Sequence, residues 1–218
     1  MKVLISFAFA CCLSTAALSA PVLSAPTTGA VLTSIAGRNW GWEFNLAGAF
    51  QINSLGLFDV GGDGLIAPHE VGIFDTLGTL LMSTTVSSAD SLVGGFRYHA
   101  LAVPAILGPG NYVLGAIFPS TGTPDGMFVS SNGAVILPGV SFVVARLGTV
   151  GSETLGFPDL AFAPNSPGYF GPTFDATALG SGAPELDTRC AASTLGFMCL
   201  LLASLEVRNR RQDLRKQS

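Results

Sequence analysis

The body of this chain lacks cysteine and lysine. All four cysteines of the 218 residues lie near the ends, at positions 11, 12, 190 and 199. A body without cysteine excludes an internal disulfide, a catalytic thiol and a thiolate metal site. Its stability must therefore come from a hydrophobic core, and a segment of about 155 residues is large enough to build one.

Positive charge is also scarce. Residues 26–183 hold three arginines and no lysine against ten acids, a net charge of −7. Proteins bind nucleic acid by placing lysine and arginine against phosphate, so this composition argues against a nucleic-acid partner. Cations, neutral glycans and other proteins suit the charge better.

Catalytic motifs are missing as well. The chain has no G-x-S-x-G, no H-E-x-x-H, no P-loop and no dinucleotide fingerprint. Of the two histidines, His99 is expected on the polar outer face of a strand. We interpret His69, beside Glu70, as a solvated loop residue, with a metal ligand or a general base as the alternatives. A pair of acids for glycoside hydrolysis stays open, because a sequence does not show their separation in space.

No stretch of the body has the pattern of a helix of ten residues. Apolar residues instead alternate with other residues over positions 40–46, 80–86, 96–100 and 112–118, which indicates half-buried strands. Turn signals such as Pro109-Gly110 and Asn132-Gly133 separate these runs. The pattern predicts an all-β fold, an antiparallel two-sheet sandwich of jelly-roll type spanning residues 26–183.

The most chemically loaded stretch is the loop 59–70. Counting from Asp59, acids stand at positions 1, 5 and 12 (Asp59, Asp63 and Glu70), Gly64 stands at position 6, and Leu65 supplies a carbonyl at position 7. This is the spacing of a twelve-residue calcium loop, although position 3 carries a glycine. We interpret the loop as a Gly-Asp-Gly turn with solvated acids between two strands, with a Ca²⁺ site formed by Asp59, Asp63, Leu65 and Glu70 as the alternative.

Four aromatic residues are candidates for stacking on sugar rings: Trp40, Trp42, Tyr98 and Tyr169. Exposed rings of this kind would supply a glycan-binding platform. Trp40 and Trp42, however, fall on the same face of one expected strand, and a row of that kind is typical of a core. Burial of these rings thus distinguishes a glycan binder from a structural domain.

The first 25 residues read as an export signal. Lys2 precedes an apolar run over residues 3–13, and small residues fill most of positions 14–20. This predicts a leader peptide that is cut between Ser19 and Ala25. The run is too short for a spanning helix, and acylation at Cys11 is the alternative.

The segment 184–218 has the pattern of a second targeting signal. Pro184 and Glu185 precede an apolar run over residues 191–205, and Arg208, Arg210 and Arg211 follow it. The order predicts a short hydrophobic helix whose basic end stays in the cytoplasm. The alternative is a terminal amphipathic helix that packs on the body.

This tail resembles the PEP-CTERM sorting signal of bacteria, which an exosortase recognises and removes. The body is similar to β-sandwich domains of such sorted proteins in GWEF (41–44), LGLFDVGGDGL (55–65), HEVGIFD (69–75) and PGNYVLGA (109–116). The resemblance implies a protein exported to the cell envelope, surface or extracellular matrix. It also implies an exosortase-like processing partner and membrane contact only through the transient C-terminal segment.

These observations predict a non-catalytic structural or adhesive protein, with Ca²⁺ as its one candidate cofactor. A carbohydrate-binding module acting on exopolysaccharide is the main alternative, and other surface proteins are further partners. A secreted glycoside-active enzyme is the third hypothesis.

Overall fold

The structure is a computed structural model that describes residues 19–24, 30–33, 35–120, 125–129, 134–162 and 168–180. The chain divides into two units, Met1–Leu179 and Gly180–Ser218, and every strand of the described residues belongs to the first unit. Most of the expected leader and all of the expected segment 184–218 lie outside the described residues. Within the described ranges, no helix is long and apolar enough to cross a membrane.

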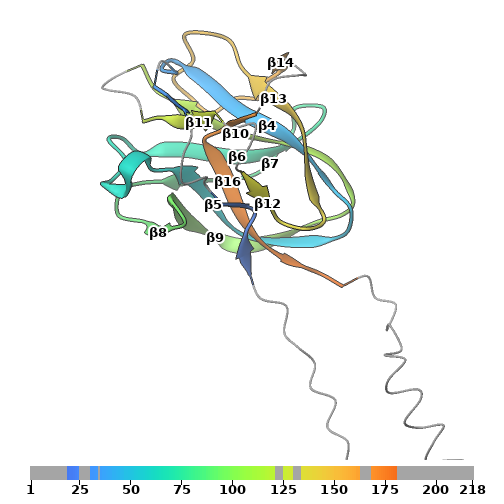
Figure 1. Cartoon of the computed structure of the whole chain (residues 1–218). Helices are drawn as coiled ribbons and strands as arrows, with labels where there is room; N and C mark the ends of the chain where they lie inside the picture. Colours follow the sequence, from blue (N-terminus) through green and yellow to red (C-terminus); the bar gives the residue numbers. More distant parts are fainter. Residues whose placement is uncertain are drawn as a thin grey trace, which may run out of the picture. The chain divides into compact units, whose positions relative to one another are not determined.

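The fold is all-β and antiparallel, as predicted (Figure 1). The larger sheet contains, in spatial order, β14 (Leu160–Phe162), β13 (Val140–Leu147), β4 (Arg38–Leu46), β10 (Gly110–Phe118), β6 (His69–Asp75) and β7 (Leu80–Val86). The second sheet contains β1 (Ala20–Pro21), β16 (Pro172–Ala178), β5 (Phe50–Phe58), β9 (Phe96–Leu107) and β8 (Ser91–Val93). Short pairings join β15 (Tyr169–Phe170), β11 (Met127–Val129) and β3 (Ala30–Leu32), and also β12 (Val135–Ile136) and β2 (Leu23–Ser24).

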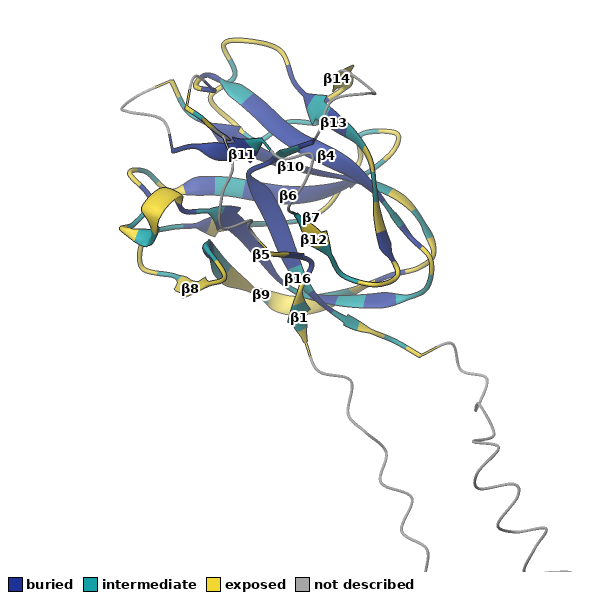
Figure 2. Ribbon diagram, viewed as in Figure 1, coloured by how far each residue is buried: buried dark blue, intermediate teal, exposed yellow. Residues whose placement is uncertain are grey.

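The core lies between the two large sheets. Trp42 and Phe44 of β4 face the second sheet, and their ring centroids lie 6.4 and 4.9 Å from that of Phe174 in β16. The apolar side of β4, which also includes Trp40 and Leu46, is at most 7% exposed. Figure 2 shows this burial along β4, β10 and β16. The period-two pattern therefore identified the core face of the central strand correctly.

The other face of β4 is buried too, which differs from the expected half-buried strand. Asn39 and Glu43 are only 2% and 7% exposed. The irregular segment 148–159, which we name the strap, covers the part of this face around Asn39. Asn39 fastens the strap, because its side-chain amide donates to the Thr154 carbonyl (3.1 Å) and its side-chain oxygen accepts from the Gly156 N–H (3.0 Å).

Two glycines make room for the strap. Gly115 of β10 and Gly72 of β6 lie opposite each other in the sheet. A Cβ on Gly115 would lie 3.1 Å from the ring of Pro158, and a Cβ on Gly72 would lie 2.8 Å from the side chain of Leu155. Because these positions carry no side chain, the strap packs directly on the backbone of the sheet.

The strand registers define two ends of the sandwich. At one end, which we call the terminal pole, β1 pairs with β16 (Ala20 opposite Ala176), so the chain enters and leaves the domain side by side. The turns 47–49 and 108–109 share this end, since Phe50 lies opposite Leu107. The opposite end, the loop pole, holds the loop 59–68, because β5 ends and β6 begins there.

Candidate functional site

The acidic, glycine-rich loop that the sequence singled out lies at the loop pole. The loop 59–68 includes a short 3-10 turn, η1 (Val60–Gly62). Gly61, Gly62 and Gly64 have φ angles of 85°, 74° and 118°, a region that favours glycine over residues with a Cβ. The glycines therefore set the path of the loop and with it the directions of its acids.

The Asp59 carboxylate is engaged in hydrogen bonds and an ion pair within the protein. It is 2% exposed, and its carboxylate accepts hydrogen bonds from the Gly64 N–H (3.2 Å) and from Arg97 Nε (2.7 Å). Arg97 Nη1 in turn donates to the carbonyls of Ser88 and Asp90, each at 2.8 Å. The ion pair of Asp59 and Arg97 thus joins the loop to β9 and to the turn before β8. Because it is buried, the loss of either charge would leave the other without compensation.

The other expected calcium ligands are divided between the loop and β6. Asp63 is exposed, and Glu70 already belongs to β6, where it accepts a hydrogen bond from the Ser83 hydroxyl of β7 (3.3 Å). Leu65 is 6% exposed. In the part of the chain that the structure describes, no group of three acid, histidine or cysteine side chains is placed to hold a metal ion. Calcium binding at this loop stays a prediction.

His69 is not the solvated loop residue that we expected. It is 2% exposed and lies at the first position of β6. Its Nδ1 lies 2.8 Å from the Ile117 carbonyl oxygen, and its Nε2 lies 2.7 Å from Asp125 Oδ2. Both ring nitrogens therefore lie within hydrogen-bond distance of an oxygen atom, one from β10 and one from Asp125. His69 is buried because it begins strand β6 in the interior of the protein and does not belong to the exposed loop.

Asp125 is the residue of this site that sequence reasoning missed. It is 8% exposed, and besides His69 it accepts hydrogen bonds from the N–H groups of Ile66 (3.0 Å) and Ala67 (3.3 Å). Burial raises the pKa of the Asp125 carboxyl, but the hydrogen bonds from His69 and the two amides outweigh it, so this pKa lies below the ordinary 3.8. Its sequence neighbourhood, Pro-Asp-Gly, signals only a turn.

Asp125, the partner of His69, borders a hollow at the loop pole. The hollow has a volume of about 430 Å³ and is lined by Thr33, Val60, Asp63, Gly64, Ile66, Asp125 and Gly126. A general base needs a free lone pair near the substrate, whereas both ring nitrogens of His69 are already engaged in hydrogen bonds within the protein. The pair of His69 and Asp125 therefore acts as a bridge that holds the loop 59–68 against β6 and β10.

The tryptophans belong to the core. Trp42 is fully buried and Trp40 is 7% exposed. Their Nε1 atoms donate to the carbonyls of Pro172 (2.9 Å) and Ile35 (3.1 Å). A ring without exposed surface does not stack on a sugar, so Trp42 is not available as a glycan contact, and Trp40 exposes only a small part of its surface.

The two tyrosine candidates differ. The Tyr98 hydroxyl is buried, and it makes no hydrogen bond of standard geometry to the described residues. Burial raises the pKa of Tyr98 above its ordinary 10.0. Tyr169 is half-buried, with its ring centroid 5.7 Å from Trp40 and 5.3 Å from Phe162, which is 37% exposed. Of the four expected glycan contacts, Tyr169, together with Phe162, best presents aromatic surface to the outside.

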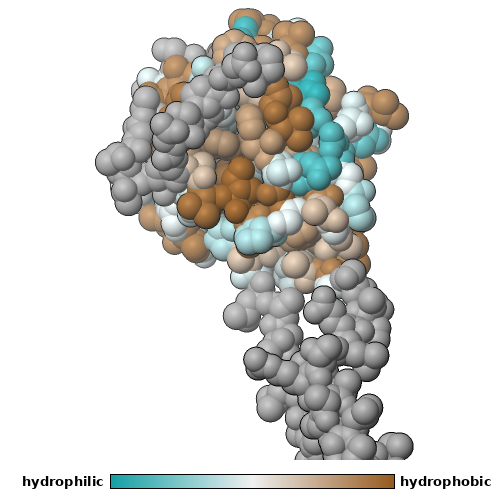
Figure 3. Space-filling view, turned by 45° about the vertical axis from the view of Figure 1, so that its right-hand side comes forward, coloured by the Kyte–Doolittle hydropathy of each residue, from teal (hydrophilic) through white to brown (hydrophobic). Residues whose placement is uncertain are grey.

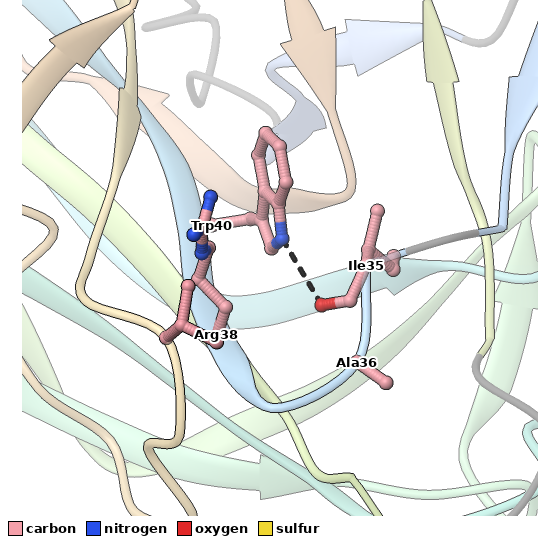
Figure 4. Close-up of a pocket in the computed structure, with 5 residues that line it drawn as sticks. Ile35, Ala36, Arg38 and Trp40 are labelled. Carbon is pink, nitrogen blue, oxygen red and sulfur yellow. Dashed lines mark hydrogen bonds between the residues drawn. The ribbon is translucent and has the colours of Figure 1, made fainter.

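A second hollow of about 220 Å³ lies beside Trp40. Ile35, Ala36, Arg38 and Val150 complete its lining, and the Arg38 guanidinium lies 5.8 Å from the Trp40 ring centroid (Figure 4). This distance is typical of a cation–π contact. The hollow therefore combines one positive charge with an apolar wall.

His99 matches its expected place on the outer face. Its side chain is 46% exposed and pairs with Asp90, at 2.8 Å between Nδ1 and Oδ1. Burial raises the pKa of the Asp90 carboxyl, but hydrogen bonds from Ser87 and His99 outweigh it, so the pKa of Asp90 is lowered.

Comparison of the chain with protein-family models, with curated proteins and with solved structures finds no match. The expected sorting residues Pro184, Glu185, Arg208, Arg210 and Arg211 lie outside the described residues. The resemblance to PEP-CTERM proteins therefore stays a prediction.

Proposed function

We propose that this protein is an exported, non-catalytic structural or adhesive domain of the cell surface or extracellular matrix, whose loop pole faces outward. The pairing of β1 with β16 carries the proposal, because the expected leader and the expected sorting segment then join the domain at the same pole. A protein held by that pole leaves the opposite loops open to its surroundings.

The strand order supports a jelly-roll-like sandwich. The chain crosses between the two large sheets from β4 to β5, from β5 to β6, from β7 to β8 and from β9 to β10. Crossings of this kind are typical of Greek-key and jelly-roll sandwiches and differ from a meander. Jelly rolls occur in capsid and lectin domains, and loops on a rigid scaffold often carry recognition. The fold by itself does not name a ligand.

Surface charge and surface apolarity support contact with other molecules. Within the part of the chain that the structure describes, salt bridges engage four of the body's ten acids, Glu43, Asp59, Asp90 and Asp125, so most of its carboxylates form no salt bridge there. Apolar side chains also gather on one face of the molecule (Figure 3). A contiguous exposed apolar patch is typical of binding surfaces.

The proposal is tested by expressing the full chain in a bacterium that carries an exosortase. Whole cells and culture medium are probed with an antibody against the folded domain, with and without protease treatment of intact cells. Processed protein at the surface or in the matrix is expected. Replacing Pro184 and Glu185 by alanine should trap the protein in the membrane, while the matched replacement of Ser181 and Gly182 by alanine should leave its location unchanged. Protein that stays in the cytoplasm would refute the proposal.

A carbohydrate-binding module is the second candidate, and the aromatic pair of Tyr169 and Phe162 favours it. Purified exopolysaccharide is titrated onto the protein by calorimetry. Binding that Tyr169→Ala weakens and that the nearby Leu160→Ala does not weaken would support glycan recognition. Equal affinity in both variants would remove Tyr169 from the site.

A further inference from the structure

Residues at the edge of the expected leader belong to the folded core. Val22 is 0% and Leu23 is 1% exposed, and both are part of the main hydrophobic cluster. The Val22 N–H donates to the Phe174 carbonyl, and the Val22 carbonyl accepts from the Leu137 N–H, each at 2.9 Å. A protein without these two residues would have a cavity in its core, and the edge of β16 would lose backbone hydrogen-bond partners.

Leader peptidases cut after small residues at the last and third-last positions of the leader. Within the range predicted from the sequence, a small residue stands last if the cut follows Ser19, Ala20, Ser24 or Ala25. Of these four cuts, the one after Ser19 also has a small third-last residue, Ala17, where the others have leucine or valine. Cuts after Ser24 or Ala25 would remove Val22 and Leu23, whereas the cut after Ser19 keeps both of them and the whole of β1.

Local electrostatics agree with the cut after Ser19. The Ser19 hydroxyl donates to the Asp175 carboxylate and accepts from Asn53 Nδ2, the latter at 2.7 Å. Pro21 lies opposite Asp175 in the register of β1 and β16. A new amino terminus at Ala20 would thus form within one residue of Asp175 and would place an ammonium group beside its carboxylate. Asn53 keeps a partner, because its Nδ2 also donates to the Thr177 hydroxyl (3.0 Å).

We propose that the leader is removed at the Ser19–Ala20 bond and that Ala20 is the first residue of the mature domain. Water adds across this peptide bond, the leader leaves with the Ser19 carboxylate, and the domain keeps the Ala20 α-ammonium. This inference rests on the proposed export of the protein, and it assigns the site at which a leader peptidase acts.

The test uses the full chain, produced in a bacterium that exports and processes leaders, and reads its amino terminus by sequencing and by intact mass. A chain that begins at Ala20 is the expected result. A chain that begins at Pro21, Ala25 or Pro26 would overturn the assignment while leaving export in place, because processing would still have occurred. An intact Met1 in the cytoplasm would overturn both proposals.

Two matched variants sharpen the test. Ala17→Phe puts a bulky ring at the third-last position of the leader and should abolish the form that begins at Ala20. Ala16→Phe makes the same change one residue earlier and should leave that form in place. Equal processing of the two variants would place the cut elsewhere and would overturn the assignment.

Discussion

Replacing His69 with glutamine should cost far more stability than the same change at His99. His69 and Asp125 are 2% and 8% exposed, whereas the His99 side chain is 46% exposed. Removal of one partner from a buried ion pair typically costs about 3–5 kcal/mol, because the other charge stays buried. Asp125 keeps its bonds to two backbone amides, so we expect the lower end, about 3 kcal/mol. For His99→Gln we expect about 0–1 kcal/mol.

Urea unfolding followed by tryptophan fluorescence measures both variants, since Trp40 and Trp42 report on the core. Asp125→Asn and the double variant His69→Gln/Asp125→Asn complete the cycle. The double variant should lose less than the sum of the two single changes, because no charge is then left alone. A loss of less than about 1 kcal/mol for His69→Gln, equal to that of the exposed control, would refute the stabilising role of the buried His69–Asp125 pair.

Three further predictions concern acid, the strap and calcium. The pKa of Asp125 is lowered from 3.8 in the folded state, so its contribution to stability is complete above about pH 3.8 and is lost as the pH falls through the folded value. Unfolding midpoints measured from about pH 5 to pH 2 should fall, and Asp125→Asn should flatten that fall. Gly115→Val should lower the free energy of unfolding by about 1–3 kcal/mol by lifting Pro158, whereas Gly108→Val, with open space around it, should change it little. If calcium binds the loop 59–70, it should raise Tm in the wild type and not in Asp63→Ala; no rise in either protein would make the loop an acidic turn.

Alternation in the sequence was enough to locate the central strand and its core face. Trp40, Trp42 and Phe44 repeat every second residue, and that period places side chains on one face whatever the rest of the chain does. It did not predict that the opposite face would be covered as well. The strap that covers it has no period, and it reaches β4 through Asn39, more than 100 residues earlier in the chain.

The candidate site was predicted only in part. The loop 59–70 does lie at the loop pole, but spacing along the chain suggested a shared ligand set for Asp59, Asp63 and Glu70. In the structure β6 begins at His69, so Glu70 lies within this strand and not in the loop. Asp59 is paired with Arg97, which donates a hydrogen bond to its carboxylate. Arg97 lies 38 residues from its partner Asp59 in the sequence, and Asp125 lies 56 residues from His69. A local sequence pattern does not predict pairings over such separations.

The sequence by itself determined the all-β class, the antiparallel pattern and the core row of β4, because these depend on side-chain alternation and on turn residues that act over a few positions. Only the tertiary structure decided that His69 is buried, that Asp125 is its partner and that Val22 and Leu23 belong to the domain. Each of these depends on contacts between distant segments, and such contacts form only when the two sheets close over one core.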